Sequence, residues 1–118
     1  SHYLDPITHL ALTTQGFGKV VSQFAGAAPK WLALGGGGYN VQAVARSWTS
    51  AYGLMSNQEL ADEIPDTYLK EYGVSTLRDS GSLPEIVQSA EKDTKEFAEA
   101  SVRAVQSLVF PMHGIRTG

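Results

Sequence analysis

Four consecutive glycines, Gly35–Gly38, constrain this chain more than any other feature of its sequence. They follow the apolar run Trp31–Leu34 and precede Tyr39 and Asn40. Glycine has no Cβ, so the backbone there can take positive φ values and lie close to a bound molecule. Each glycine also costs about 0.5–1 kcal/mol relative to alanine in a regular element. The pattern predicts a strand, a tight bend and a helix start, and the bend serves either ligand binding or a plain strand-to-helix turn.

Amphipathic helices are predicted on both sides of this bend. Thr13 or Thr14 is a good N-cap, and apolar residues then recur at helical spacing until the chain nears Gly26. Asn40 caps the second helix. The two apolar faces, which we expect to pack in a core, consist of Phe17, Val20, Val21 and Phe24 in the first helix and Val41, Val44, Ala45, Trp48, Tyr52 and Met55 in the second.

Charge is distributed unevenly along the chain. Residues 1–58 carry one acidic and three basic side chains, whereas residues 59–118 carry 11 acidic and six basic ones. Four charges in the first half is about 7% of its residues, against roughly 25% in typical soluble domains. We therefore expect the first half to be covered by other polypeptide, and Arg46 within it to form a salt bridge or to bind backbone carbonyls.

Composition also excludes several classes of function. There is no cysteine, so disulfides and thiolate metal sites are excluded, and a cytoplasmic location is expected. No cluster of basic residues with interleaved aromatic residues suggests nucleic acid as a partner. No apolar run approaches the roughly 18 residues needed to span a membrane.

Phosphate-binding motifs match the glycines poorly. A P-loop needs a Lys-Ser or Lys-Thr pair after its glycines, and Tyr39-Asn40 occupies that place. A dinucleotide fingerprint that pairs Gly35 with Gly37 puts Asn40 where a third glycine or alanine belongs, although Glu59 is loosely placed to bind a ribose. Phosphate binding remains a third-ranked alternative.

Two blocks of sequence resemble a known family. Leu-Gly-Gly-Gly-Gly-Tyr-Asn (34–40), followed by Val-Ala-Arg-Ser-Trp-Thr (44–49), resembles the loop and helix of the zinc-dependent histone deacetylases. Ser-His-Tyr-Leu-Asp-Pro-Ile-Thr-His-Leu (1–10) is similar to the bacterial acetoin-utilisation (AcuC-type) branch. The resemblance implies an α/β fold class: a C-terminal fragment of the three-layer arginase/deacetylase fold, mostly helical here, with one clear parallel-type strand at 31–35.

The domain organisation expected from this resemblance is the C-terminal part of a single deacetylase domain over residues 1–118. Helix, strand, glycine loop and helix occupy 1–55, an acidic loop with short helical turns 56–82, a C-terminal helix 83–110 and a tail 111–118. No second convincing strand is present to pair with 31–35. A chain that begins at Ser1 without methionine is also expected to be excised from something longer.

The resemblance also implies site residues. Tyr39 would be catalytic, because its phenol would donate a hydrogen bond to the acetyl oxygen as that oxygen becomes an alkoxide. Gly36, Gly37 and Gly38 would form one wall of a narrow channel for the substrate, and Ile7 would supply an apolar contact there. This interpretation requires an opening beside the glycines that Tyr39 can reach.

Cofactor and substrate follow from the same resemblance. Zinc would be held in the parent protein by two aspartates and a histidine outside this chain, with none bound by the chain alone. The substrate would be an acetylated lysine protein or a small amide, and the isolated chain is expected to be inactive. His2, Asp5 and His9 are residue types that bind zinc, but their spacing matches no known ligand set, and hydrogen bonds within a loop are the better interpretation.

Two rival functions remain open. The chain could belong to a non-catalytic relative that keeps the scaffold and binds ligands or partners. Alternatively, its apolar first half could make it an interaction module that forms a homo-oligomer or pairs with another subunit.

Overall fold

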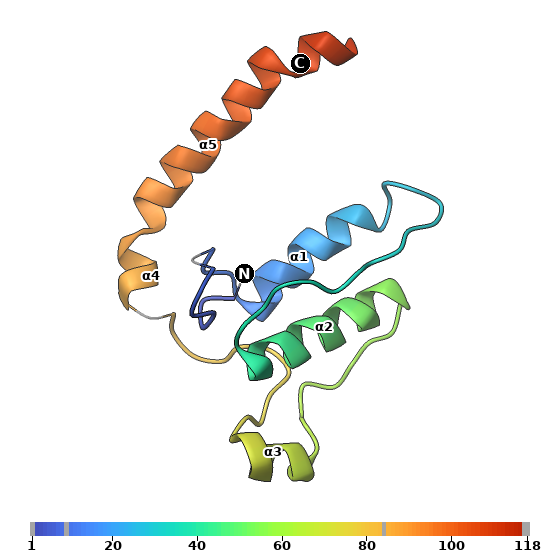
Figure 1. Cartoon of the computed structure of the whole chain (residues 1–118), viewed down its shortest axis with the longest axis vertical. Coiled ribbons are helices and arrows are strands. Elements are labelled where there is room, and N and C mark those ends of the chain that lie inside the picture. Colours follow the sequence, from blue (N-terminus) through green and yellow to red (C-terminus); the bar gives the residue numbers. More distant parts are fainter. Residues whose placement is uncertain (1, 9, 84, 117–118) are drawn as a thin grey trace. The chain divides into compact units, whose positions relative to one another are not determined.

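The computed structural model describes residues 2–8, 10–83 and 85–116. The chain divides into two compact units, Ser1–Gly81 and Ser82–Gly118. Helices and loops make up both of them (Figure 1). No helix within the described ranges has both the length and the hydrophobicity that crossing a bilayer requires.

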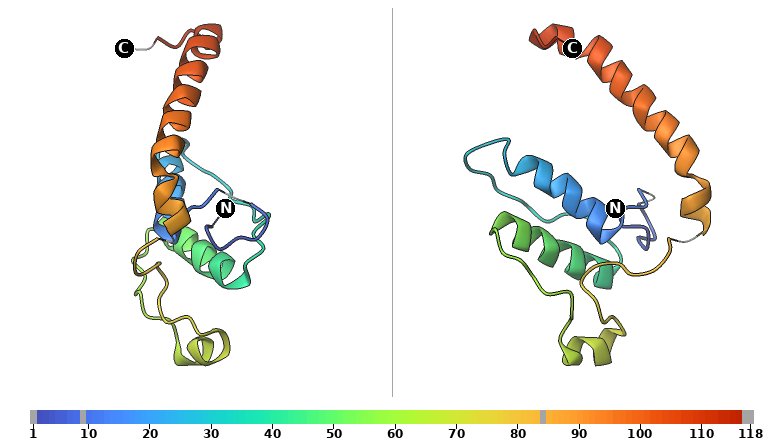
Figure 2. Two further views of the ribbon diagram at one scale, coloured as in Figure 1. Left: turned by 90° about the vertical axis from the view of Figure 1, so that its left-hand side faces the viewer. Right: turned by 180° about the vertical axis from the view of Figure 1, so that it is seen from behind.

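Two neighbouring helices form the centre of the first unit. Helix α1 (Thr14–Phe24) is capped by Thr13, whose hydroxyl accepts from Gly16 N at 2.9 Å. Helix α2 (Val41–Met55) is capped by Asn40, whose Oδ1 accepts from Ala43 N at 2.9 Å. The chain between them doubles back, so both helices run in the same direction (Figure 2). Both predicted helices and their caps are confirmed.

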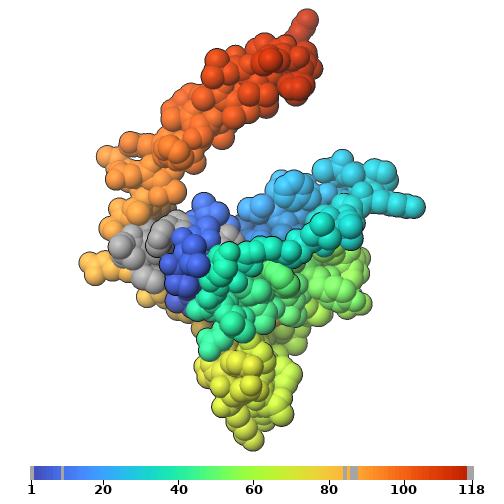
Figure 3. Space-filling view, in the orientation of Figure 1, coloured from blue at the N-terminus to red at the C-terminus, as the bar shows by residue number. Residues whose placement is uncertain are grey.

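The predicted strand at 31–35 is wrong. Residues 31–40 form no regular element, and the two bridges found among the described residues, His2 with Leu12 and Glu63 with Thr76, lie elsewhere. A parallel strand exists only where neighbouring strands pair with its backbone, and here the segment lies beside helices. Leu32 and Leu34 are 81% and 83% exposed. The segment between α1 and α2 lies at the surface of the first unit (Figure 3).

A long loop with one short helix completes the first unit. Helix α3 (Asp66–Tyr72) ends at Gly73, whose left-handed backbone lets its N–H donate to Leu69 O at 2.8 Å. On either side of α3 the chain pairs briefly, since Ile64 N donates to Ser75 O at 3.1 Å. This agrees with the predicted acidic surface loop containing short helical turns.

The second unit holds the C-terminal helices. Helix α4 (Glu85–Ser89) is followed by α5 (Glu91–Leu108) and by the 3₁₀-helix η1 (Phe110–His113). The single helix predicted at 83–110 is therefore divided at Ala90; position 84 and the last two residues of the predicted tail lie outside the described residues. The apolar stripe of α5 is exposed, with Phe97 at 76% and Leu108 at 70%.

Few apolar side chains are buried in the part of the chain that the structure describes. Among the described residues only Ala43 and Leu77 are buried hydrophobics, whereas five polar or charged residues are buried: His2, Asp5, Thr14, Arg46 and Ser47. Much of the apolar face predicted for α1 is exposed, since Val20 and Phe24 are 48% and 55% accessible. Hydrogen bonds and ion pairs therefore provide much of the stabilisation that a hydrophobic core provides in other domains.

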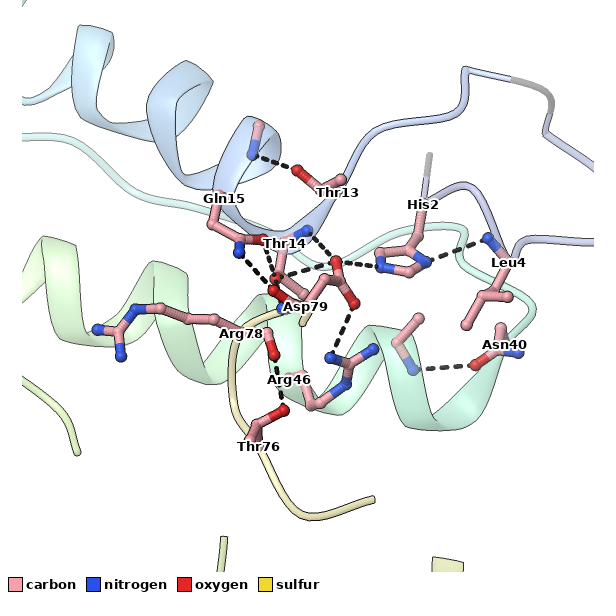
Figure 4. A network of polar contacts seen from close by, with 12 residues as sticks. His2, Leu4, Thr13, Thr14, Gln15, Asn40, Arg46, Thr76, Arg78 and Asp79 are labelled. Carbon is pink, nitrogen blue, oxygen red and sulfur yellow. Dashed lines mark hydrogen bonds and ion pairs between the residues drawn. The ribbon is translucent and has the colours of Figure 1, made fainter. Parts of the chain in front are cut away.

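The carboxylate of Asp79 is the centre of these contacts (Figure 4). Its Oδ2 accepts from Thr14 N at 2.7 Å and lies 2.9 Å from His2 Nε2, and its Oδ1 lies 2.9 Å from an Arg46 guanidinium nitrogen. Its backbone is also held, because Asp79 N donates to Thr14 Oγ1 at 2.9 Å and Gln15 Nε2 donates to Asp79 O at 2.7 Å. One side chain thus joins the N-terminal loop, α1, α2 and the end of the long loop.

The same contacts set the protonation state of Asp79. Burial by itself opposes the charged form, but the Thr14 N–H, the His2 ring and the Arg46 guanidinium outweigh it and lower the pKa of Asp79 overall. Charge-assisted hydrogen bonds of this kind are among the strongest in proteins. The carboxylate is therefore held in its charged form at neutral pH.

Asp79→Asn is expected to destabilise the first unit by about 3–5 kcal/mol, because it leaves the buried Arg46 without its counter-ion. Urea unfolding at pH 7 measures this change. Asp66→Asn is the control, since Asp66 is exposed in the first turn of α3 and its loss costs at most about 1 kcal/mol. Equal losses in the two variants would contradict the role of Asp79.

The pH dependence of stability tests the same contact. A carboxylate whose pKa is lowered by folding stabilises the folded state above its ordinary pKa of about 3.9, and this contribution is lost as pH falls through the folded pKa. The unmodified chain should therefore lose stability more steeply below about pH 4 than Asp79→Asn does.

Candidate functional site

Two of the four glycines are required by close packing. A Cβ added to Gly35 would overlap the Trp48 ring, and one added to Gly38 would overlap Cγ2 of Val44. Gly38 also has a φ of +89°, which L-residues rarely adopt. The glycine loop therefore lies directly against α2. In contrast, Gly36 has open space around its Cβ position and no positive φ.

Tyr39 stands between two fixed points of the backbone. Before it is Gly38, whose side-chain-free backbone fits against Val44, and after it is Asn40, whose cap begins α2. Tyr39 itself is 56% exposed. Its backbone is thus held at the helix start while its side chain is open to solvent.

The buried carboxylate of Asp5 joins this loop to the N-terminal segment. Its Oδ1 accepts from Ile7 N at 2.9 Å and Thr8 N at 3.0 Å, and its Oδ2 accepts from Tyr39 N at 3.1 Å. The N–H groups of Thr8 and Ile7, with a further contribution from Tyr39, lower the pKa of Asp5 to about 2. The residue is only 6% exposed. At neutral pH Asp5 is therefore a fixed anion that orders two segments at once.

A small pocket of about 180 Å³ lies beside the glycines. Its walls come from the N-terminal loop, α1, the glycine loop and α2, and include His2, Asp5, Gly35–Gly38 and Trp48. Typical small-molecule pockets hold 300–1,000 Å³, so only a small group fits here. Tyr39 and the 62%-exposed Ile7 do not line this pocket, but Asp5, which does, accepts hydrogen bonds from the backbone N–H groups of both.

The described residues do not make a metal site. No group of three or more His, Cys, Asp or Glu among them is arranged to hold an ion. His2 and Asp79 bond to each other, and the Asp79 carboxylate is further engaged by Arg46 and Thr14. Asp5 forms hydrogen bonds within its loop, as the sequence predicted, and His9 lies outside the described residues. Zinc therefore has no ligand set in this part of the chain.

Sequence reasoning missed the long-range contacts of both carboxylates. Asp79 lies in the segment predicted as an acidic loop, and Asp5 was predicted to form hydrogen bonds within its own loop but not to bond to Tyr39. One signal was present: Arg46 is among the few charges of the first half, and a cation in a segment expected to be covered needs a buried anion. The salt bridge predicted for Arg46 is confirmed, and its partner is Asp79.

Residues 1–55 match the sequence model of the histone deacetylase domain. Histone deacetylase 8 of Xenopus tropicalis is 33% identical over 104 residues, which are 78% of this chain and 28% of that protein. The chain belongs to the histone deacetylase/AcuC-type family. Acetoin utilization protein AcuC of Bacillus subtilis is 31% identical over 80 residues, 61% of this chain and 20% of that protein.

A shorter but more similar match is histone deacetylase 8 of Danio rerio, 40% identical over 70 residues. It covers 58% of this chain and 18% of that protein, so the chain spans less than a third of each relative described here. No solved structure matches the chain. Histone deacetylases are generally zinc-dependent hydrolases, and membership of the family implies the arginase/deacetylase fold.

Gly38→Ala is expected to destabilise the first unit by at least about 1–2 kcal/mol, because the new Cβ meets Val44 and φ is positive. Gly36→Ala is the matched control and should change stability by less than about 0.5 kcal/mol. Urea unfolding of both variants measures the difference. Indistinguishable unfolding midpoints would show that the loop does not lie against α2 as described.

Proposed function

We propose that this chain is the C-terminal portion of a zinc-dependent deacetylase that hydrolyses acetyl-lysine or a related amide. It supplies the tyrosine that stabilises the transition state and the glycine loop beside the substrate, but not the metal ligands. The isolated chain, lacking those ligands, is inactive. The parent protein is a soluble cytoplasmic enzyme that acts on acetylated protein or on a small amide.

One observation carries the proposal. Tyr39 follows the glycine loop inside the region that matches the histone deacetylase domain, and it is held by its backbone while its side chain remains exposed. The exposed side chain leaves the phenol accessible to a substrate.

Tyr39 acts in this proposal as a hydrogen-bond donor. A phenol ordinarily remains protonated at neutral pH, so it can donate to the acetyl oxygen as negative charge develops there. A donor held in place toward such charge contributes about 10²–10³ in rate. The fixed backbone at Gly38 and Asn40 supports this role, because a donor that is already oriented needs no reorganisation during the reaction.

The neighbouring residues shape the substrate site. Gly36, Gly37 and Gly38 form one wall of the acyl channel, where a side chain would obstruct the lysine stem. Gly36 and Gly37 have open space at their Cβ positions, which leaves room beside the loop for a ligand. Ile7 adds an apolar contact to the same channel. The family's zinc would be held by residues other than those described here.

Self-association is a second candidate, favoured by the exposed apolar side chains of the first unit. Leu32 and Leu34 are more than 80% exposed, which is unusual for leucine. An interaction module has no need of the Tyr39 hydroxyl, so the following experiment separates the two functions.

In the full-length protein that contains this chain, Tyr39→Phe should lower kcat for an acetyl-lysine peptide by about 10²–10³. Zinc content and thermal stability should stay unchanged, because only a solvent-exposed hydroxyl is removed. Tyr52→Phe is the matched control, since Tyr52 is also exposed, at 64%, and lies on α2 away from the glycine loop. Full activity of Tyr39→Phe would refute the catalytic role.

A further inference from the structure

We propose that Asp5 is the positioning residue of Tyr39, joining it through one carboxylate to the segment that carries Ile7. This inference rests on the proposed function of Tyr39 and goes beyond it. It gives the buried side chain of Asp5 a role in holding the catalytic phenol in position.

The glycine loop creates the need for such an anchor. Four glycines precede Tyr39, and those at 36 and 37 meet nothing at their Cβ positions. A chain of this kind has large conformational freedom, so it cannot by itself place the next residue to within the fraction of an ångström that catalysis requires. Gly38 and Asn40 fix the backbone on either side of Tyr39, and the hydrogen bond from Tyr39 N to Asp5 Oδ2, at 3.1 Å, adds a contact to Tyr39 itself.

The anchor itself is well held. Asp5 Oδ1 accepts from Ile7 N and Thr8 N, and Asp5 N donates to His2 O at 2.9 Å. The His2 ring in turn bonds to Asp79. Asp5 is thus fixed to the same polar cluster that joins α1 and α2, and its two oxygens serve two different segments.

Because the two carboxylate oxygens bond to different segments, one variant can remove the bond to Tyr39 and keep those to Ile7 and Thr8. In Asp5→Asn, the single amide oxygen can keep the two bonds from Ile7 and Thr8, which leaves the amide NH₂ facing the Tyr39 N–H. Two donors cannot bond to each other. Asp5→Asn therefore releases Tyr39 while preserving the turn at Ile7, whereas Asp5→Ala releases both.

The test measures kcat and KM of the full-length protein with an acetyl-lysine peptide. Asp5→Asn should lower kcat about ten- to a hundredfold with KM nearly unchanged, since a small displacement of a catalytic group has effects of this size. Asp5→Ala should lower kcat and also raise KM, because the Ile7 contact is lost too. Asp66→Asn removes an exposed charge of the same kind and should change neither.

A double-variant comparison shows whether Asp5 acts through Tyr39. In the Tyr39→Phe background, Asp5→Asn should cause almost no further loss of kcat, since the hydroxyl being positioned is already absent. An equal loss in both backgrounds would overturn the inference, and so would unchanged kcat in Asp5→Asn alone. Full activity of Tyr39→Phe would instead reject the proposed function, which keeps the two failures distinct.

A measurement that does not depend on activity shows whether the Asp5→Asn variant keeps its fold. In the NMR spectrum of the 118-residue chain, Asp5→Asn should shift the Tyr39 amide proton upfield while the Ile7 and Thr8 amides change little. Shifts of all three amides together would mean that the turn had collapsed, and an unmoved Tyr39 amide would mean that the bond is absent. Either result contradicts the selective anchor.

Discussion

The first unit depends on the ion pair between Asp79 and the buried Arg46. Few apolar side chains are buried among the described residues, so apolar packing accounts for only part of the alignment of α1 with α2. Asp79 adds to it, because it accepts from the first amide of α1 and pairs with a guanidinium from α2. A carboxylate can be buried only where donors surround it, so the contacts that stabilise its charge also fix the geometry of four segments.

Asp5 extends this order to the candidate site. It is linked to the Asp79 cluster through His2 and holds the backbone of Tyr39 at the end of the glycine loop. The loop carries no side chains and is fixed at both ends, at Gly35 by Trp48 and at Gly38 and Tyr39 by Val44 and Asp5. The glycines make the loop backbone flexible, but residues outside the loop hold it in a defined position.

The sequence predicted those features that depend on contacts between residues close together in the chain, such as helix caps. Thr13 and Asn40 were recognisable caps because a cap bonds to an amide three residues away. Pairing across the chain could not be predicted: His2 and Asp79 are 77 residues apart, and Asp5 and Tyr39 are 34. The strand at 31–35 failed for the same reason, since its composition indicated a strand but pairing needs partner strands, which the described part of the chain does not provide. The catalytic role of Tyr39 came from family resemblance and stays a prediction.

Amide hydrogen exchange tests the central claim most directly, namely that the carboxylates of Asp79 and Asp5 order the site. If Asp79 and Asp5 hold the Thr14 and Tyr39 N–H groups as described, these two amides should exchange many times more slowly than those of the exposed Gly36 and Gly37, although Tyr39 directly follows the same loop. Exchange of Tyr39 and Thr14 as fast as that of the two glycines would contradict the account.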